Sequence, residues 1–146
     1  MTIAFASDHR GYKLKQRLTK YFEKEGYNII DLGTNSDISV DYPDYAFKMG
    51  EVINSKKADL GVIMCGTGIG VSISCNKIKG MYCALVNTVD EAVLARRHNN
   101  ANILALRGNM NGMTAKNIIR VFITTNFSNA ERHRNRIKKI NKFESK

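Results

Sequence analysis

The sequence predicts one α/β/α domain built on a five-stranded parallel β-sheet with helices on both faces. Short apolar runs alternate with longer amphipathic stretches, as in right-handed β-α-β units. The run 58–65 is apolar throughout, which is typical of a strand covered on both faces. No linker, repeat or low-complexity segment divides the 146 residues, so we expect residues 1–146 to form a single domain.

The first half of the chain is predicted to contain three strands and two helices: strands 2–7, 27–33 and 58–65, and helices 11–26 and 45–55. Leu14, Leu18 and Phe22 recur at helical spacing in the first helix, and Gly26 is a natural C-cap for it. The only proline, Pro43, ends a polar loop at a place where the second helix can begin.

The second half is predicted to contain a helix from the glycine-rich turn to about residue 77, strands 81–86 and 101–106, helices 88–98 and 112–126, and a basic helix from about residue 129. Thr88 and Glu91 have the spacing of a capping box, in which the threonine is the N-cap and the glutamate lies three residues later.

Charge and hydropathy exclude several classes of protein. The formal net charge is +10, and residues 132–146 hold seven Lys or Arg against one Glu. Such a segment favours anionic partners, either nucleic acid or a small phosphorylated ligand. No apolar run approaches the roughly 20 residues of a membrane span, and the N-terminus is typical of a strand rather than a signal peptide. We therefore expect a cytoplasmic protein without a membrane partner.

The three cysteines, Cys65, Cys75 and Cys83, are an odd number without a C-x-x-C pair. Neither a disulfide framework nor a zinc ribbon is expected from this pattern. Cys75 and Cys83 are interpreted as small buried apolar residues. Cys65 is different, because it ends an apolar strand immediately before a glycine-rich turn.

Polar and reactive side chains gather at the ends of the predicted strands. Asp8 and His9 follow the first strand, Cys65 ends the third, and His98 and Asn99 precede the fifth. Ligands of open α/β sheets bind beyond the carboxyl ends of the strands, so we expect a site at this edge. His98 taken alone is equally consistent with a solvated cation at a helix C-terminus.

The turn "CGTGIG" at residues 65–70 matches no common phosphate-binding motif. It lacks the spacing of a dinucleotide fingerprint and the Gly-Lys of a Walker A loop, and Val71 stands where a cysteine phosphatase has arginine. Its glycines allow the amides of residues 66–70 to point into one space at a helix start, which is an anion site. A thiol at a helix N-terminus has a lowered pKa, so Cys65 is a candidate base or nucleophile. The alternative is a tight strand–helix junction with an inert thiol.

Arg132 and Arg136 lie four residues apart and therefore share a helix face. Such a pair is usually part of a solvated basic face. In this segment it can instead hold a phosphate group.

Several motifs together carry a family resemblance over roughly residues 2 to 140: "SDHRGYKLK", "DLGT" with "VDYPDYA", "CGTGIGVSISCNK", "RRHNNANILAL" and "ERHRNR". In this order they resemble the type B ribose-5-phosphate isomerases, the family that also contains the galactose-6-phosphate isomerase subunits. The resemblance implies a Rossmann-like three-layer α/β/α sandwich. It also implies a homodimer or tetramer with active sites between subunits, and no metal or cofactor.

The resemblance also implies roles for individual residues. Cys65 matches the general base, Thr67 the hydroxyl that moves protons between O1 and O2, and His98, with Asp8 nearby, the group that opens the sugar ring. The remaining matches contact substrate: the loop Gly66, Thr67, Gly68, Ile69 and Gly70 through its amides, Tyr42 and Asn99, and a phosphate clamp of His9, Arg132 and Arg136.

The function expected on these grounds is interconversion of ribose 5-phosphate and ribulose 5-phosphate through an enediolate, a reaction of the pentose phosphate pathway. One departure affects the substrate: Asn109 stands where many members have arginine, and Arg107 lies two residues earlier. An isomerase of galactose 6-phosphate or allose 6-phosphate is therefore an alternative. A basic nucleic-acid-binding module is an alternative of another class, although the basic residues are not interleaved with aromatic ones.

Overall fold

A parallel sheet with the strand order β2-β1-β3-β5-β4 forms the centre of the protein, as shown by a computed structural model that describes residues 1–146. The strands are β1 (Thr2–Ser7), β2 (Asn28–Asp31), β3 (Leu60–Cys65), β4 (Cys83–Leu85) and β5 (Ile103–Arg107). The helices are α1 (Tyr12–Lys24), α2 (Tyr42–Asn54), α3 (Ile69–Asn76), α4 (Val89–Asn99), α5 (Gly112–Thr124) and α6 (Glu131–Glu144). The predicted strand number and the parallel pairing are confirmed.

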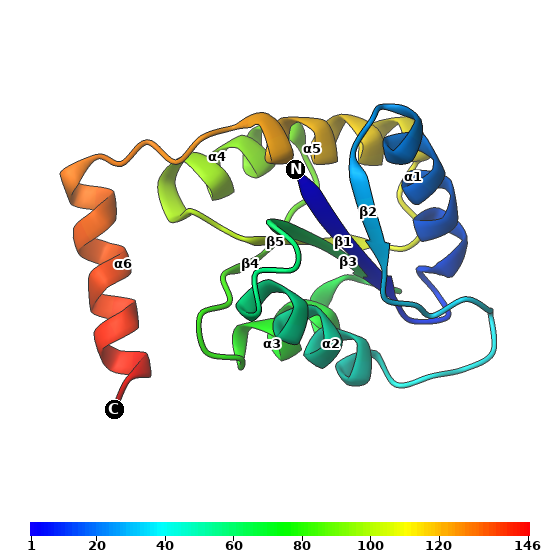
Figure 1. The fold of residues 1–146 in the computed structure, drawn as a ribbon, viewed down its shortest axis with the longest axis horizontal. Coiled ribbons are helices and arrows are strands. Elements are labelled where there is room, and N and C mark those ends of the chain that lie inside the picture. The colour runs from blue at the N-terminus through cyan, green and yellow to red at the C-terminus, as the bar shows by residue number, and fades with distance from the viewer.

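Helices cover both faces of the sheet, as predicted (Figure 1). Helices α1, α4 and α5 enclose one core with strand residues such as Phe5 and Val62, while α2 and α3 enclose the other with Ala6 and Ile63. Successive strand residues point to opposite faces, so both cores require apolar residues from the same strands. This explains why residues 60–65 are all buried.

Most element boundaries differ from the predicted ones by a few residues. Helix α2 begins at Tyr42, three residues earlier than predicted, with Pro43 in its first turn. Strand β2 ends at Asp31 rather than at residue 33, because the chain turns at Gly33 with a φ of 91°. Strand β5 begins at Ile103 and extends to Arg107, which places that arginine at the carboxyl edge. The capping box of Thr88 and Glu91 is confirmed.

The order of the strands determines where a ligand can bind. The chain places β2 on one side of β1 and then crosses to place β3 on the other side. The loops that leave β1 and β3 therefore diverge at the carboxyl edge of the sheet, and such a switch point is where α/β folds bind ligands.

Helix α6 stands apart from the α/β body and is joined to it by a short segment after α5 (Figure 1). It contacts α4, and near its C-terminal end the carboxylate of Glu144 accepts hydrogen bonds of 3.0 and 3.1 Å from the backbone N–H of Gly80. Its only buried residue is His133, and Ile140 and Phe143 are exposed. None of the helices has the length and apolar character needed to cross a membrane.

Candidate active site

A cavity of about 420 Å³ lies at the carboxyl ends of β1 and β3. It is lined by Asp8, Arg10, Tyr42, Cys65, Gly66, Thr67, Ile69, Gly70 and Ile73. Seven of these are residues that the sequence predicted for the site: Asp8, Tyr42, Cys65, Gly66, Thr67, Ile69 and Gly70. The structure therefore brings together residues that lie more than 60 positions apart in the chain.

Cys65 is the last residue of β3, and only 4% of its surface is exposed. Its carbonyl accepts a hydrogen bond of 2.7 Å from the backbone N–H of Gly108, just after β5. The strand end is thus held on the β5 side, and the thiol lies at the wall of the cavity. Cys75 and Cys83 are buried, as predicted. The pKa of the Cys83 thiol is raised, mainly by its hydrogen bond with Cys75 and also by its burial.

Each glycine of the turn after Cys65 meets a different steric demand. Gly68 is the N-cap of α3 with a φ of 77°, and a Cβ there would lie 2.9 Å from the backbone carbon of Leu106. A Cβ on Gly66 would lie 2.8 Å from the side chain of Arg10, and one on Gly70 would lie 2.6 Å from the ring of Tyr42. The glycines therefore form the turn and also let two side chains lie against it.

Several amides of this turn are free. Gly66, Thr67 and Gly70 line the Cys65 cavity, whereas the predicted site residue Gly68 is buried and does not line it. The N–H groups of Gly66, Thr67, Gly68 and Gly70 donate no hydrogen bond within the chain, whereas Ile69 donates to the Thr67 hydroxyl at 3.2 Å. The free amides lie at the N-terminus of α3, where the helix dipole also favours negative charge. The geometry suits an oxyanion placed beside the Cys65 thiol.

Asp8 is 5% exposed and has a defined structural task. Its Oδ1 accepts hydrogen bonds from the N–H groups of Arg10 at 2.8 Å and Gly11 at 3.1 Å, so the carboxylate fixes the turn that starts α1. This turn presents Arg10 to the cavity, a residue that the sequence analysis did not assign to the site. Its position in the loop after the first strand was the available signal.

Tyr42 lines the Cys65 cavity, whereas His9 is not among its lining residues. The Nδ1 atom of His9 accepts a hydrogen bond of 3.2 Å from the N–H of Val40, so the other ring nitrogen, Nε2, carries the proton of the neutral ring. Tyr42 begins α2 two residues later and lies against Gly70. The loop between β2 and α2 thereby orients the His9 ring and leads directly to Tyr42.

Three of the other predicted site residues, His98, Asn99 and Arg136, line a separate cavity of about 220 Å³ beside α6. Its lining consists of Tyr82, His98, Asn99, His133, Arg136, Ile137 and Ile140, and no residue is shared with the Cys65 cavity. Arg132 is exposed on the same helix as Arg136. Within one chain Asp8 and His98 line different cavities, so their expected proximity stays a prediction that requires a second subunit.

His133 lines this second cavity and was not predicted from the sequence. Its ring centroid lies 4.4 Å from that of His98, and its Nδ1 lies 2.7 Å from the Ser128 hydroxyl. Burial lowers the pKa of His133, and the charges of Arg132, His98, Arg136 and Arg97 lower it further. Glu91 serves the N-terminus of α4 and not His98, since its carboxylate accepts from the N–H groups of Asn87 and Thr88.

A third cavity of about 350 Å³ adjoins the glycine turn on the β5 side. It is lined by Gly66, Thr67, Ile69, Leu85, Asn87, Arg107 and Asn109. The Nε and Nη2 atoms of Arg107 donate to Oδ1 of Asn87 at 3.1 and 2.8 Å, which fixes the guanidinium without neutralising it.

Nowhere in the chain do three or more His, Cys, Asp or Glu side chains gather to hold a metal ion.

Comparison with known proteins gives a consistent picture. The family model described as Ribose/Galactose Isomerase matches residues 3–140. A galactose-6-phosphate isomerase subunit of Clostridium acetobutylicum is 36% identical, over 98% of this chain and 83% of the relative. The ribose-5-phosphate isomerase B of Clostridium thermocellum has a TM-score of 0.96 at 39% identity, over 99% of this chain and 98% of that structure.

A second solved structure, the ribose-5-phosphate isomerase B of Mycoplasma genitalium with bound ribulose 5-phosphate, has a TM-score of 0.92 at 39% identity. The alignment covers 99% of this chain and 97% of that one. The predicted Rossmann-like α/β sandwich is therefore confirmed at the level of the whole fold.

Proposed function

The chain belongs to the ribose/galactose isomerase family and is a sugar-phosphate isomerase, and we propose that its reaction is the interconversion of ribose 5-phosphate and ribulose 5-phosphate. The observation that carries this proposal is the Cys65 thiol in one cavity with Gly66, Thr67 and Gly70, whose amides are free. An aldose–ketose isomerisation requires a base beside a carbon and donors beside the adjacent oxygens, and this arrangement offers both.

The Cys65 thiolate removes the proton from C2 of the open-chain aldose, and the electron pair of that C–H bond forms the enediolate. The amides of the turn hold the negative oxygen, and such preorganised donors are worth about 2.7–4 kcal/mol each. The Thr67 hydroxyl moves a proton between O1 and O2, and the Cys65 thiol returns its proton to C1. A positioned base contributes roughly 10²–10⁴-fold to such a step.

The residues proposed for ring opening and for phosphate binding require a second subunit. His98, Asn99 and Arg136 line a cavity that shares no residue with that of Cys65, so one chain does not assemble them around one substrate. A homodimer in which the α4 end and α6 of one subunit reach the Cys65 cavity of its partner assembles the whole set. The protruding α6, which carries Arg132 and Arg136, supports this arrangement (Figure 1).

Arg107 supports a phosphorylated substrate even though Asn109 replaces the arginine of many relatives. Its guanidinium is fixed by Asn87 and lines a cavity that includes Gly66 and Thr67. A fixed cation in a cavity that adjoins the glycine turn suits the phosphate group of a sugar phosphate. The smaller Asn109 leaves room in the same cavity, and this keeps galactose 6-phosphate or allose 6-phosphate as the second candidate substrate.

A steady-state assay of the purified protein with ribose 5-phosphate, galactose 6-phosphate and allose 6-phosphate tests the proposal. We expect the highest kcat/KM with the pentose phosphate and its loss in the Cys65→Ala variant. A preference for a hexose phosphate assigns the second candidate. Full pentose turnover by Cys65→Ala contradicts the assigned base.

A further inference from the structure

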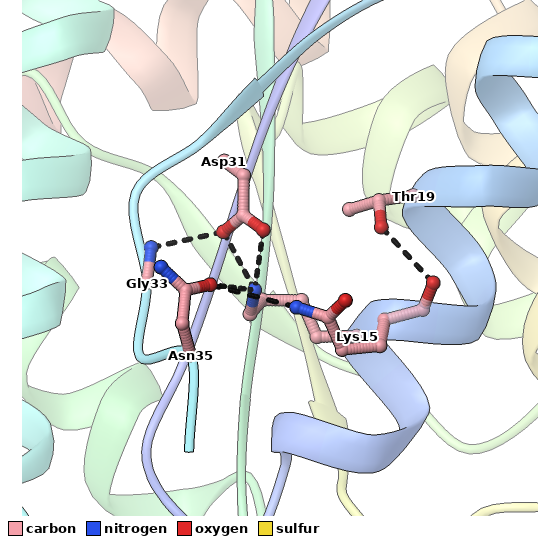
Figure 2. Close-up of polar contacts among 6 residues, drawn as sticks. Lys15, Thr19, Asp31, Gly33 and Asn35 are labelled. Carbon is pink, nitrogen blue, oxygen red and sulfur yellow. Dashed lines mark hydrogen bonds and ion pairs between the residues drawn. The ribbon is translucent and has the colours of Figure 1, made fainter.

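A buried ion pair outside the catalytic cavity joins helix α1 to the end of β2. No surface of the Lys15 side chain is exposed, and its Nζ lies 2.6 and 2.7 Å from the two carboxylate oxygens of Asp31. Nζ also lies 3.4 Å from the Oδ1 atom of Asn35 (Figure 2). Figure 2 shows the lysine reaching from the helix into the space between these two side chains.

A chain of hydrogen bonds connects the ion pair to the backbone beside the active site. Oδ1 of Asp31 accepts a hydrogen bond of 2.9 Å from the N–H of Gly33. The carbonyl of Gly33 accepts from the N–H of Ser7 at 2.7 Å, and the N–H of Thr34 donates to the Ser7 carbonyl at 2.8 Å. Ser7 is directly followed by Asp8 and His9. The start of the β2–α2 loop is thus tied to the strand end that carries two site residues.

The far end of the same loop leads into the site. Residues 32–41 contain no helix or strand, and the N–H of Val40 donates to Nδ1 of His9 at 3.2 Å. Tyr42 follows at the start of α2, with its ring against Gly70. A shift at the first end of this loop therefore changes the contact that orients His9 and the approach of Tyr42.

Stability alone does not explain a charge pair at this place. Taking a lysine and a carboxylate out of water has a desolvation cost that the pair interaction often only offsets, and well-packed apolar residues can replace such pairs without loss. Asp31 keeps 32% of its side chain exposed, whereas Lys15 is fully enclosed, so the lysine bears most of this cost. The pair does fix the position of α1 relative to the end of β2, because the two carboxylate oxygens of Asp31 and the side chain of Asn35 hold one ammonium group in place.

We propose that Lys15 is a positioning residue of the active site, which acts through Asp31 and Gly33 to hold the β2–α2 loop so that His9 keeps its contact with Val40 and the Tyr42 ring stays against Gly70. The effect on turnover rests on the proposed isomerase function, whereas the effect on His9 does not. Lys15 itself lines none of the cavities that hold the site residues.

The test compares Lys15→Met with Lys20→Met, an exposed lysine on the same helix. We expect kcat/KM for ribose 5-phosphate to fall roughly 10- to 100-fold in Lys15→Met, as for other small misplacements of site groups, and to stay within twofold in Lys20→Met. If Lys15→Met does not fold, the charge-free pair Lys15→Met/Asp31→Asn takes its place, since asparagine keeps an acceptor for Gly33.

A second readout separates positioning from a general loss of stability. NMR of the His9 ring nitrogens reports whether Nδ1 accepts the Val40 hydrogen bond. We expect these signals to change in the Lys15 variant at a temperature where it remains folded, and not in Lys20→Met. A folded Lys15 variant with native His9 signals overturns the inference. If the parent protein does not turn over ribose 5-phosphate, the proposed function fails and the His9 signals alone decide this inference.

Discussion

The imidazole rings of His98 and His133 lie against each other with their centroids 4.4 Å apart and their planes inclined by 35°. They come from α4 and α6, so this contact also joins the protruding helix to the α/β body. His133 is held from its other side by the Ser128 hydroxyl at 2.7 Å. The ring that we assign to ring opening therefore packs directly against a buried histidine.

The charge of His133 is expected to make the α6 contact sensitive to acid. Burial and the cations Arg97, Arg132 and Arg136, together with His98, lower its pKa below the ordinary value of 6.5. The neutral form is thus favoured in the fold, and the unfolded chain binds the proton more readily. Stability is therefore full above pH 6.5 and is lost as the pH falls below it.

Thermal unfolding monitored between pH 8 and pH 5 checks this expectation, with His133→Asn as the comparison. Asparagine can still bond to Ser128 and has no charge to gain. We expect the melting temperature of the parent protein to fall more steeply with acid than that of the variant. If the melting temperatures of the two proteins fall in parallel with pH, His133 is not the source of the acid sensitivity. Tyr82 lines the same cavity, but its pKa is raised from 10.0 by burial and then by Glu144, so it does not titrate in this range.

Replacement of the three cysteines is expected to separate catalysis from packing. Cys65→Ala removes the proposed base and should lower kcat by roughly 10²–10⁴-fold, with little change in melting temperature. Cys75→Ala and Cys83→Ala alter the core behind α3 and should keep kcat/KM within a few-fold. Iodoacetamide should inactivate the parent protein and the Cys75 and Cys83 variants alike, and ribose 5-phosphate should slow this reaction. Activity that survives complete alkylation of Cys65 rules out this residue as the general base.

Two glycines of the turn are expected to fail in different ways. Gly68→Ala forces a side chain into a left-handed conformation and against the Leu106 backbone, so it should destabilise the fold by about 1–3 kcal/mol or more. Gly70→Ala meets only the ring of Tyr42, which is 39% exposed and can move aside. It should lower kcat/KM roughly 10- to 100-fold in a stable protein. Denaturant unfolding and kinetics distinguish them, and Gly112→Ala, with no atom within 4 Å of its Cβ, is the matched control.

The proposal that two subunits build each active site makes a prediction about mixed dimers. Cys65→Ala and His98→Ala should each be inactive, since each loses one half of every site. In a dimer with one chain of each kind, one of the two sites receives the native Cys65 and the native His98. Co-expression should therefore recover activity at about one quarter of all sites if the chains pair at random. Mixtures as inactive as the separate variants contradict a site built by two subunits.

Removal of Arg107 tests the phosphate end of the substrate. Arg107→Ala eliminates a cation that Asn87 holds beside the glycine turn. A hydrogen bond to a charged group is worth about 1.5–3 kcal/mol, so we expect KM for ribose 5-phosphate to rise roughly 10- to 100-fold with a smaller change in kcat. Arg97→Ala, an exposed arginine outside this cavity, shows the effect of net charge alone. An unchanged KM in Arg107→Ala means that the phosphate binds elsewhere.

Local patterns in the sequence were enough to predict the fold. Strand and helix positions follow from apolar spacing and from capping residues such as Thr88, because these depend on neighbours a few positions away. The alternation of strands and helices then restricts the sheet to parallel pairing. Cys65 and its glycine turn were also recognisable, since both lie in one short segment at the end of a buried strand.

Only the tertiary structure decided which distant side chains meet. The family resemblance implied that Asp8 lies near His98, and the structure shows that within one chain the two residues line different cavities. No local pattern separates His133 from the solvated residues around it, and none indicates that Lys15 is buried against Asp31. Periodicity determines which face of an element is apolar, whereas the partner of a polar side chain depends on how whole elements are placed against each other.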